Sequence, residues 1–146
     1  MKKSLFLMVL VILSCQKEEK PILVTPEQLH SSIDKVTEIM IHDIFSPPVA
    51  SRIYAYPNIA AYEIISLNDE RFTSLAGQIH ELTPIPSPDA AKPVNNALAA
   101  LVAHMDLSRR LIFSEDKMEV FRDSLYAIWT SQNEDEFEAS KEYGLQ

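Results

Sequence analysis

The sequence predicts an all-α protein, a bundle of five or six helices, on three observations. Glycine is scarce, with 2 residues in 146 where about 7% is usual, so the chain lacks the φ > 0 positions that tight β-hairpins need. Apolar residues recur at spacings of three and four over several stretches, as on one face of a helix. No stretch alternates apolar and polar residues as a half-buried strand does.

Charge and composition exclude several classes of protein. The chain carries 13 Lys+Arg against 21 Asp+Glu, a formal net charge of −8, so it offers no basic surface of the kind that nucleic-acid binding requires. The single cysteine excludes an internal disulfide framework and a zinc site with several thiolates. With 47% apolar and 23% charged residues, the composition is that of an ordinary globular domain.

The beginning of the chain is interpreted as a targeting signal followed by a tether. Two lysines precede the apolar residues 5–13, a stretch of about 14 Å as a helix, which is too short to span a bilayer and typical of a secretory signal. In ILSC the single Cys15 follows a serine, which resembles a bacterial lipobox. We therefore expect residues 1–14 to be a lipoprotein signal peptide, Cys15 to carry the lipid anchor and residues 15–25 to form a tether. An ordinary signal with a coincidental cysteine is the alternative.

The residues that follow the cysteine sharpen this expectation. CQKEEK resembles the export signal of Bacteroidetes surface lipoproteins, in which Gln-Lys and two acidic residues follow the lipidated cysteine. A charged, solvated linker is the alternative interpretation. The first interpretation predicts an extracytoplasmic protein held at the outer membrane or cell surface by its N-terminal lipid, because three lipid chains hold a membrane far more firmly than one acyl group.

Residues 26–146 are predicted to form the α-helical domain, which begins with a helix from Pro26 to about Ile44. Thr25 and Gln28 form a capping box, and proline suits the first helical position. The helix ends before Pro47, because proline cannot continue it. Its apolar face consists of Leu29, Ile33, Val36, Met40 and Ile44.

Residues 47–65 are predicted to form the second helix and the most deeply buried one. The segment is rich in small and aromatic residues, and small residues allow neighbouring helices to approach closely. Pro57 lies inside the pattern, so we expect a kink or a break near residues 54–56. The inward face consists of Ala50, Ile53, Pro57, Ala60 or Ala61, and Ile64.

The helical pattern weakens between residues 68 and 93. Leu75 and Ile79 are interpreted as members of a short helix. Prolines 84, 86 and 88 predict an extended surface loop.

Three further helical patterns follow this loop. The first carries Val94, Ala97 or Leu98, Leu101 and Met105. The second is capped by Ser114 and buries Met118, Phe121, Leu125 and Ile128 or Trp129. The third opens at a box formed by Asn133 and Glu136 and turns Phe137 inward.

The histidines give little support for a metal or catalytic site. The chain has four histidines, His30, His42, His80 and His104. No two of them stand three or four residues apart, so no helical face presents a pair of histidine ligands. His42 beside Asp43 is the most suggestive pair, but adjacent helix residues do not face each other. A histidine satisfied at a helix interface is the alternative reading of His42.

Carboxylates give no stronger signal. Glu38, Asp43 and Glu63 would have to converge to bind a metal, and a di-iron site needs Glu-x-x-His pairs that neither EIMI nor EIIS supplies. The acidic run at residues 134–138 is interpreted as a solvated helix start that favours the macrodipole. A Gly-x-Ser-x-Gly nucleophile motif is absent from the sequence. We therefore assign no catalytic, cofactor-binding or metal-binding residue in this chain.

Arg52 stands out because it lies in the most apolar and aromatic segment of the sequence. A guanidinium in such surroundings needs a carboxylate, a helix C-terminus or solvent. One interpretation is a structural salt bridge to another helix. The other is that Arg52 helps to line an anion-handling core completed by residues outside this chain.

The run IMIHDIFSPPVASRIYAYPNIAAYEII, residues 39–65, resembles the N-terminal helical region of the vanadium-dependent haloperoxidase-like lipoproteins of Bacteroidetes, in the phosphatidic acid phosphatase type 2 superfamily. SPPVASRIYAY and IAAYE carry the resemblance most specifically. FTSLAGQIHEL and RRLIFSEDKMEVFRDSL fit the same region more loosely. The resemblance extends over most of residues 25–143 and concerns a scaffold region.

The resemblance implies three anion-binding motifs: a Lys with a later Arg-Pro, a Ser-Gly-His, and a Ser-Arg followed by His and Asp. The first two are absent from this sequence. Ser51-Arg52 resembles the start of the third, but the family's histidine would fall at Asn58 and its acid at Tyr62. An amide cannot bond phosphorus or vanadium as that histidine does, so this match is a decoy.

Two functions from different classes follow. The first is the N-terminal scaffold part of a secreted, lipid-anchored haloperoxidase or acid phosphatase of this superfamily, inactive alone and part of a larger α-helical fold. Its expected partners are the membrane and the missing C-terminal helices, without which the apolar face of residues 47–65 would be uncovered. Vanadate or phosphate would belong to the full-length protein. The second is a self-sufficient helical surface lipoprotein that binds a partner or carbohydrate, for which residues 16–146 offer enough chain to form a core.

Overall fold

The computed structural model describes residues 20–67 and 69–146. Within these residues it contains five α-helices and no strand: α2 (Pro26–His42), α3 (Pro47–Ser66), α4 (Asn96–Arg110), α5 (Glu115–Gln132) and α6 (Glu134–Gly144). The all-α prediction is confirmed.

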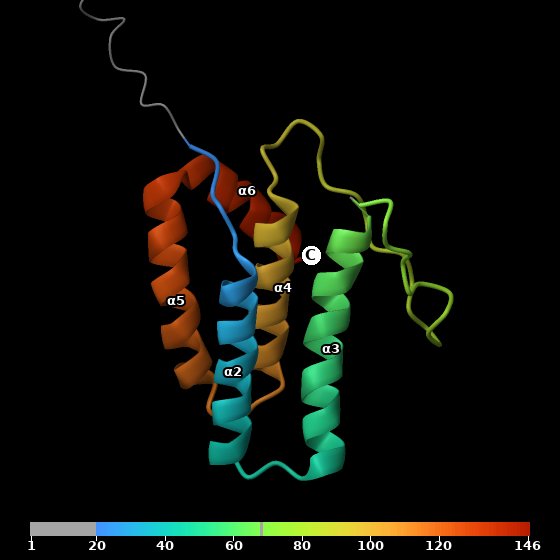
Figure 1. Cartoon of the computed structure of the whole chain (residues 1–146), viewed down its shortest axis with the longest axis vertical. Coiled ribbons are helices and arrows are strands. Elements are labelled where there is room, and N and C mark those ends of the chain that lie inside the picture. Colours follow the sequence, from blue (N-terminus) through green and yellow to red (C-terminus); the bar gives the residue numbers. More distant parts are fainter. Residues whose placement is uncertain (1–19, 68) are drawn as a thin grey trace, which may run out of the picture.

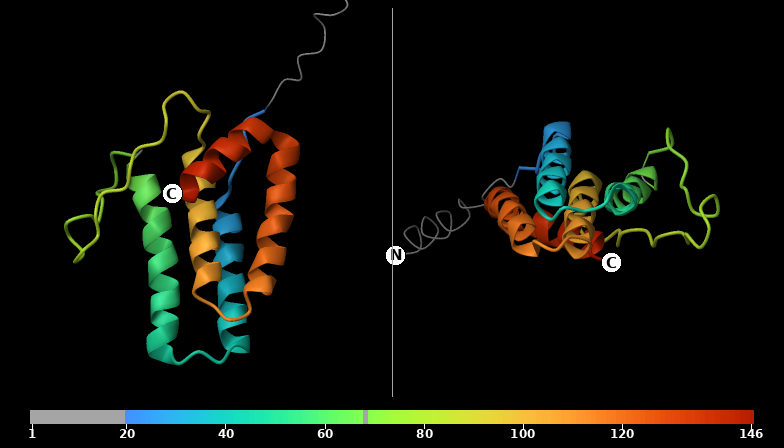
Figure 2. Two further views of the ribbon diagram at one scale, coloured as in Figure 1. Left: turned by 180° about the vertical axis from the view of Figure 1, so that it is seen from behind. Right: turned by 90° about the horizontal axis from the view of Figure 1, so that it is seen from below.

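The bundle is arranged around α4. Helices α2, α3, α5 and α6 all pack on α4, and α5 also packs on α2 and α6. Figures 1 and 2 show α3 at the edge of the bundle, with the long segment that leads to α4 running outside it. The shorter α6 crosses the end of the bundle at which the described chain begins.

The most deeply buried helix is α4, and the prediction that residues 47–65 would hold that place is wrong. Every residue from Leu98 to Met105 is buried in α4. In α3 burial is confined to one face, formed by Ile53, Pro57, Ala61, Glu63 and Ile64. The reason is position: α4 has neighbours on several sides, whereas α3 packs mainly on α4.

Helix α2 begins as predicted and ends slightly earlier. Thr25 and Gln28 form the expected capping box, in which Thr25 N donates to Gln28 Oε1 at 3.0 Å. The far end is a Schellman motif. Phe45 N donates to Met40 O at 3.2 Å and Ile44 N to Ile41 O at 3.3 Å. Ile44 thereby adopts a left-handed conformation with φ 57°.

Helix α3 is continuous through Pro57, so the predicted break near residues 54–56 does not occur. A proline inside a helix removes one hydrogen bond and crowds the preceding turn, at a cost of about 3 kcal/mol. The Pro57 ring is fully buried in the face of α3 that packs on α4. Burial of the ring offsets part of that cost, and the helix is held along its length by α4.

The segment between α3 and α4 contains no helix among its described residues, and the short helix predicted at Leu75 and Ile79 is wrong. Instead Ala76 and Ile79 form an isolated bridge, with Gly77 at φ 78°. Glycine adopts this left-handed conformation without steric cost. The prolines at 84, 86 and 88 lie in an extended stretch, as predicted.

Helices α5 and α6 meet over an aromatic core. Trp129 and Phe137 are buried there, with Tyr126 partly buried against them; the Tyr126 and Phe137 rings are 5.0 Å apart in an edge-to-face arrangement. Burial raises the pKa of the Tyr126 hydroxyl to about 12, although the nearby charge of Arg122 acts to lower it. Of the two expected candidates on α5, Trp129 is the inward residue and Ile128 is exposed.

The second glycine is explained by a close approach between helices. A Cβ at Gly144 would lie 2.4 Å from the carbonyl oxygen of Ala99. Gly144 therefore lets the end of α6 rest directly on the backbone of α4.

Candidate functional site

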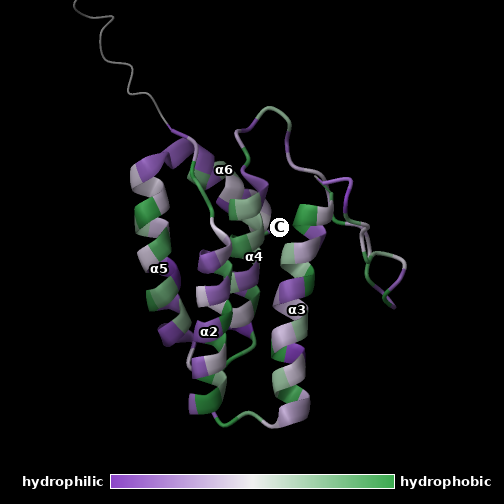
Figure 3. Cartoon of the chain, in the orientation of Figure 1, coloured by the Kyte–Doolittle hydropathy of each residue, from purple (hydrophilic) through white to green (hydrophobic). Residues whose placement is uncertain are grey.

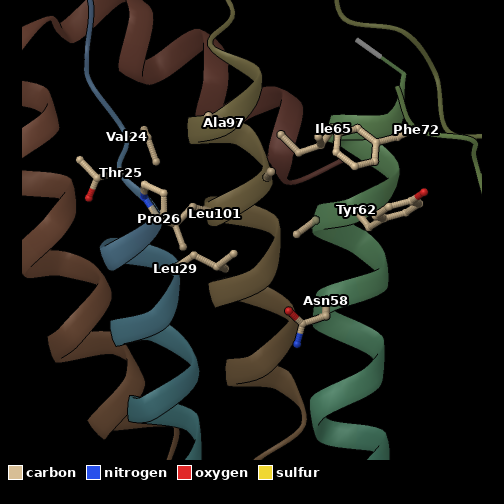
Figure 4. A pocket seen from close by; sticks show the side chains of 12 residues that line it. Val24, Thr25, Pro26, Leu29, Asn58, Tyr62, Ile65, Phe72, Ala97 and Leu101 are labelled. Atoms are coloured by element: carbon tan, nitrogen blue, oxygen red, sulfur yellow. The ribbon is translucent and has the colours of Figure 1, made fainter. Parts of the chain in front are cut away.

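An apolar groove lies between α2 and α3, with α4 as its floor. Its volume is about 500 Å³. Figure 4 shows side chains from α2 and α3 on either side of α4. The groove is lined by Val24, Thr25, Pro26 and Leu29 at the start of α2, by Asn58, Ala61, Tyr62 and Ile65 of α3, by Phe72, and by Ala97, Ala100 and Leu101 of α4.

Polar groups contribute little to this groove. No charged residue lines it. The Tyr62 hydroxyl donates to Thr73 O at 2.9 Å, and Asn58 Nδ2 donates to Tyr54 O at 2.8 Å. The Asn58 carbonyl oxygen is the main polar atom left for a bound group. An apolar occupant therefore fits the groove better than an ion does.

The histidines do not come together in a site. His30, His42 and His80 are exposed. His104 is 2% exposed, and its Nδ1 lies 3.0 Å from Ser32 Oγ, within hydrogen-bonding distance. Burial lowers the pKa of His104 to about 4, so it is neutral at neutral pH. The alternative reading of His42 as a histidine satisfied at a helix interface is wrong, because His42 is exposed. His104 is the histidine that lies between helices.

The three carboxylates considered as metal ligands are each used elsewhere. Glu38 pairs with Lys35 at 2.9 Å on the surface. Glu63 is 1% exposed and accepts hydrogen bonds from Ser74 Oγ at 2.5 Å and Leu75 N at 2.7 Å. Glu63 therefore fixes the start of the long segment on α3. Among the described residues no group of His, Cys, Asp and Glu is arranged to hold a metal ion.

Asp43 holds the turn between α4 and α5. Its carboxylate accepts hydrogen bonds from Phe113 N at 2.9 Å, Ser114 N at 3.0 Å and Ser114 Oγ at 2.5 Å. Burial acts to raise the pKa of Asp43, but the hydrogen bonds from Ser114 and Phe113 outweigh it and the pKa is lowered. Ser114 was predicted to cap α5 with its side chain, which instead bonds Asp43.

Arg52 is exposed. Of its two interpretations, the structural salt bridge to another helix is wrong, since Arg52 forms no ion pair with any described residue. Solvent satisfies it, because it projects from the open side of α3. The other arginine candidates are neutralised: Asp106 binds both Arg109 and Arg110, and Glu115 also binds Arg109.

The residues of the decoy motif lie along α3 but form no anion site. Ser51 Oγ donates to Pro48 O at 2.9 Å. Asn58 and Tyr62 line the apolar groove. Arg52 is the one cation of this set, and a tetrahedral oxyanion needs several converging donors. The described residues therefore do not fit vanadate or phosphate.

A polar cluster that local sequence patterns did not predict joins the start of the described chain to α4 and α6. Asn95 Nδ2 donates to Ile22 O at 2.8 Å and to Glu136 Oε1 at 3.1 Å. Glu136 Oε2 accepts from Ile22 N at 2.7 Å, and Asn133 caps α6 through Glu136 N at 3.1 Å. The predicted box of Asn133 and Glu136 therefore forms only in its Asn133 half, because the Glu136 carboxylate bonds Ile22 and Asn95 instead. The asparagine before an apolar run was the available signal for Asn95.

Cys15, the predicted lipid anchor, lies outside the described residues, as do residues 1–14 and most of the predicted tether. None of the described helices has the length and apolar character needed to cross a membrane.

Comparisons with known proteins relate the chain to a solved structure. A scan against models of known protein families and a search of curated proteins find no match. Among solved structures, the chain is similar to a protein described as the first bacterial vanadium-dependent iodoperoxidase, with 63% sequence identity and a TM-score of 0.86. The match covers 88% of this chain and 31% of that protein. Over the matched region, the chain therefore has a vanadium haloperoxidase-like fold, as its sequence resemblance implied.

Proposed function

We propose that this chain is the N-terminal helical scaffold of a secreted, lipid-anchored vanadium haloperoxidase-like protein, whose anion-binding residues lie outside residues 1–146. The observation that carries the proposal is the 63% identity with a vanadium-dependent iodoperoxidase over 88% of the chain. The chain spans 31% of that protein, so the activity belongs to the larger protein. Vanadate or phosphate would be its cofactor or substrate group, and iodide oxidation is the reaction suggested by the relative's description.

The first test measures what the chain does alone. Vanadate is titrated into the purified chain by calorimetry, and halide oxidation and phosphate-ester hydrolysis are assayed beside it. We expect no saturable vanadate binding and no turnover, because the described cations are paired with acids or stand alone. Binding in the micromolar range, or turnover that Arg52→Ala abolishes, would contradict the scaffold role.

The second test supplies the rest of the fold. A chimera joins this chain to the part of the iodoperoxidase outside the matched 31%, in place of that protein's own segment. We expect vanadate-dependent iodide oxidation by the chimera, as for the parent enzyme assayed in parallel. A folded chimera without activity would contradict the proposal.

The lipid anchor is a separate part of the proposal. Cys15 after ILS, and QKEE after Cys15, favour lipidation and surface export. Intact cells should incorporate labelled fatty acid into the protein, and Cys15→Ala should abolish this. Labelling that survives the substitution would contradict the anchor, while unchanged protease accessibility after replacing Lys17, Glu18 and Glu19 by Ala would contradict the export signal alone.

The alternative function is a self-sufficient surface lipoprotein that binds a partner. The apolar groove between α2 and α3 is the observation that favours it, because preformed apolar hollows are common binding sites. A stable, monodisperse chain that binds a partner without any haloperoxidase segment would support this alternative.

A further inference from the structure

The groove between α2 and α3 has a shape that could accommodate a helix. Both helices pack on α4, and their hydrogen bond between Thr37 and Tyr54, at 2.8 Å, lies beyond the end of the groove marked by Leu29 and Asn58. Above that bond the two helices flank α4 (Figure 4), where Ala97 is exposed and Ala100 and Leu101 are buried. A strand would find no sheet edge to pair with in the described chain, so an incoming segment would have to satisfy its own backbone, as a helix does.

The side chains of the groove favour the same occupant. Small residues form its floor and part of its wall, at Ala97 and Ala100 of α4 and Ala61 of α3. Small side chains let a helix approach within the 8–10 Å that separates packed helix axes. Leu29 of α2 and Ile65 of α3 line the two sides of the groove. Since the lining carries no charge, the face that enters must be apolar.

The length of the groove sets the size of that face. Along α3 the groove extends from Asn58 to Ile65, about 10 Å at 1.5 Å per residue. Two turns of a helix span this distance and present apolar side chains at positions i, i+3 or i+4, and i+7. The occupant is therefore an amphipathic helix rather than a large folded surface.

We propose that the groove receives an apolar helix from the part of the haloperoxidase-like protein that lies outside this chain, an inference that rests on the proposed function. The matched region is 31% of the iodoperoxidase, so more than two thirds of that protein lies outside it and is available to supply the helix. The groove lies between two helices over Ala97, the α4 lining residue that stays exposed in the described chain. Docking there would join the scaffold to the portion that carries the anion site.

Ala97 provides a sharp test, because it lines the groove but is exposed in the chain alone. Ala97→Glu places a charge on the floor of the groove near the start of α4, where an acidic residue is tolerated. We expect the melting temperature of the chain alone to stay unchanged within about 1–2 °C, and that of the chimera to fall by several degrees or more. Ala127→Glu, the same change at an exposed position of α5, is the matched control and should leave both proteins unchanged.

A second measurement does not depend on stability. Ala97→Cys, in a Cys15→Ser background, carries an environment-sensitive fluorophore. Its emission should shift to the blue in the chimera relative to the chain alone. If the chimera does not fold, the remaining iodoperoxidase segment is expressed separately and added to the labelled chain, with the same shift expected.

The outcomes separate the two proposals. Equal effects of Ala97→Glu in chain and chimera, together with an unshifted fluorophore, would overturn the docking inference even if the chimera oxidises iodide. A groove effect in a folded but inactive chimera would support docking and contradict the proposed function. A blue shift in the chain alone that grows with its concentration would identify a second copy as the occupant and overturn the proposal.

Discussion

Helices α4 and α3 are built from similar residues but hold opposite places in the bundle. Both contain four alanines and several branched apolar residues. Yet α4 is buried from Leu98 to Met105, while α3 buries one face and turns Arg52 and Tyr56 toward solvent. Small residues indicate where helices approach closely, but the same composition serves a central helix and an edge helix. What distinguishes the two is the number of neighbours, which the local pattern does not contain.

The difference predicts an uneven distribution of stability. The α4 side includes the aromatic core of α5 and α6, the buried His104 and the Asp43 contacts. The α3 side is held by one apolar face and by Glu63. Substitutions of comparable size should therefore cost much more on the first side than on the second.

The largest effect is expected at Trp129, which is fully buried. Trp129→Ala should lower the free energy of unfolding by about 3–5 kcal/mol, because it removes a large buried side chain and leaves a cavity. Tyr56→Ala, at a half-exposed site on α3, is the control and should cost less than about 1 kcal/mol. Chemical denaturation followed by circular dichroism measures both, and similar costs would contradict the contrast.

The next effect depends on pH and concerns His104 on α4. The folded chain keeps this histidine neutral, with its pKa lowered from 6.5 to about 4 by burial, whereas the unfolded chain protonates it near pH 6.5. Stability from this group is therefore constant above pH 6.5 and falls as pH drops toward 4, by up to about 3 kcal/mol. Unfolding measured from pH 7.5 to 4.0 should show a smaller loss in His104→Gln than in the wild-type chain. His80→Gln, at an exposed site, serves as the control, and identical pH profiles for all three proteins would refute the effect.

A smaller effect is expected where Asp43 holds the turn between α4 and α5. Asp43→Ala removes the acceptor of three hydrogen bonds and should cost about 2 kcal/mol at neutral pH, since hydrogen bonds to a charged group contribute more than neutral ones. Asp43→Asn keeps an acceptor and should cost less. Because the pKa of Asp43 is lowered in the folded chain, the difference between wild type and Asp43→Ala should shrink as pH falls below about 4. A difference that does not change with pH would contradict a charged acceptor.

The smallest effect is expected at Arg52 on the open face of α3. Arg52→Ala should change the free energy of unfolding by less than about 0.5 kcal/mol, as is usual for exposed positions away from specific contacts. Arg109→Ala is the comparison, because Arg109 binds Asp106 and Glu115 and is mostly covered. A large loss for Arg52→Ala in thermal melts would mean that α3 has a partner on this face.

Much of the fold was predictable from local signals. The capping box at Thr25, the cap at Asn133 and the apolar faces of the helices follow from side-chain chemistry and a 3.6-residue period, which act within a few residues along the chain. The vanadium haloperoxidase-like fold was predicted from residues 39–65. The short helix predicted at Leu75 does not form. Leu75 N instead donates a hydrogen bond to the carboxylate of Glu63, which lies 12 residues earlier in the chain.

The candidate site was less predictable, for a physical reason. The groove arises from three helices meeting at particular angles, and its floor at Ala97 and Ala100 is 35 residues or more from its α3 wall at Asn58 and Ala61. Each alanine also fits the pattern of an ordinary core residue. Polar residues that bind backbone across the fold, such as Asn95, likewise have partners that no local spacing reveals.

The turn after α2 contains a strained residue, Ile44, whose substitution should increase the stability of the folded chain. Position 44 is the left-handed residue of the Schellman motif, where glycine or asparagine is usual, and a β-branched residue there is strained by about 1–2 kcal/mol. The Ile44 side chain is 88% exposed, in a turn drawn largely in hydrophobic colours in Figure 3, so burial does not compensate the strain. Ile44→Asn should raise the free energy of unfolding by about 1 kcal/mol, which makes this position the natural starting point for a stabilised variant of the scaffold.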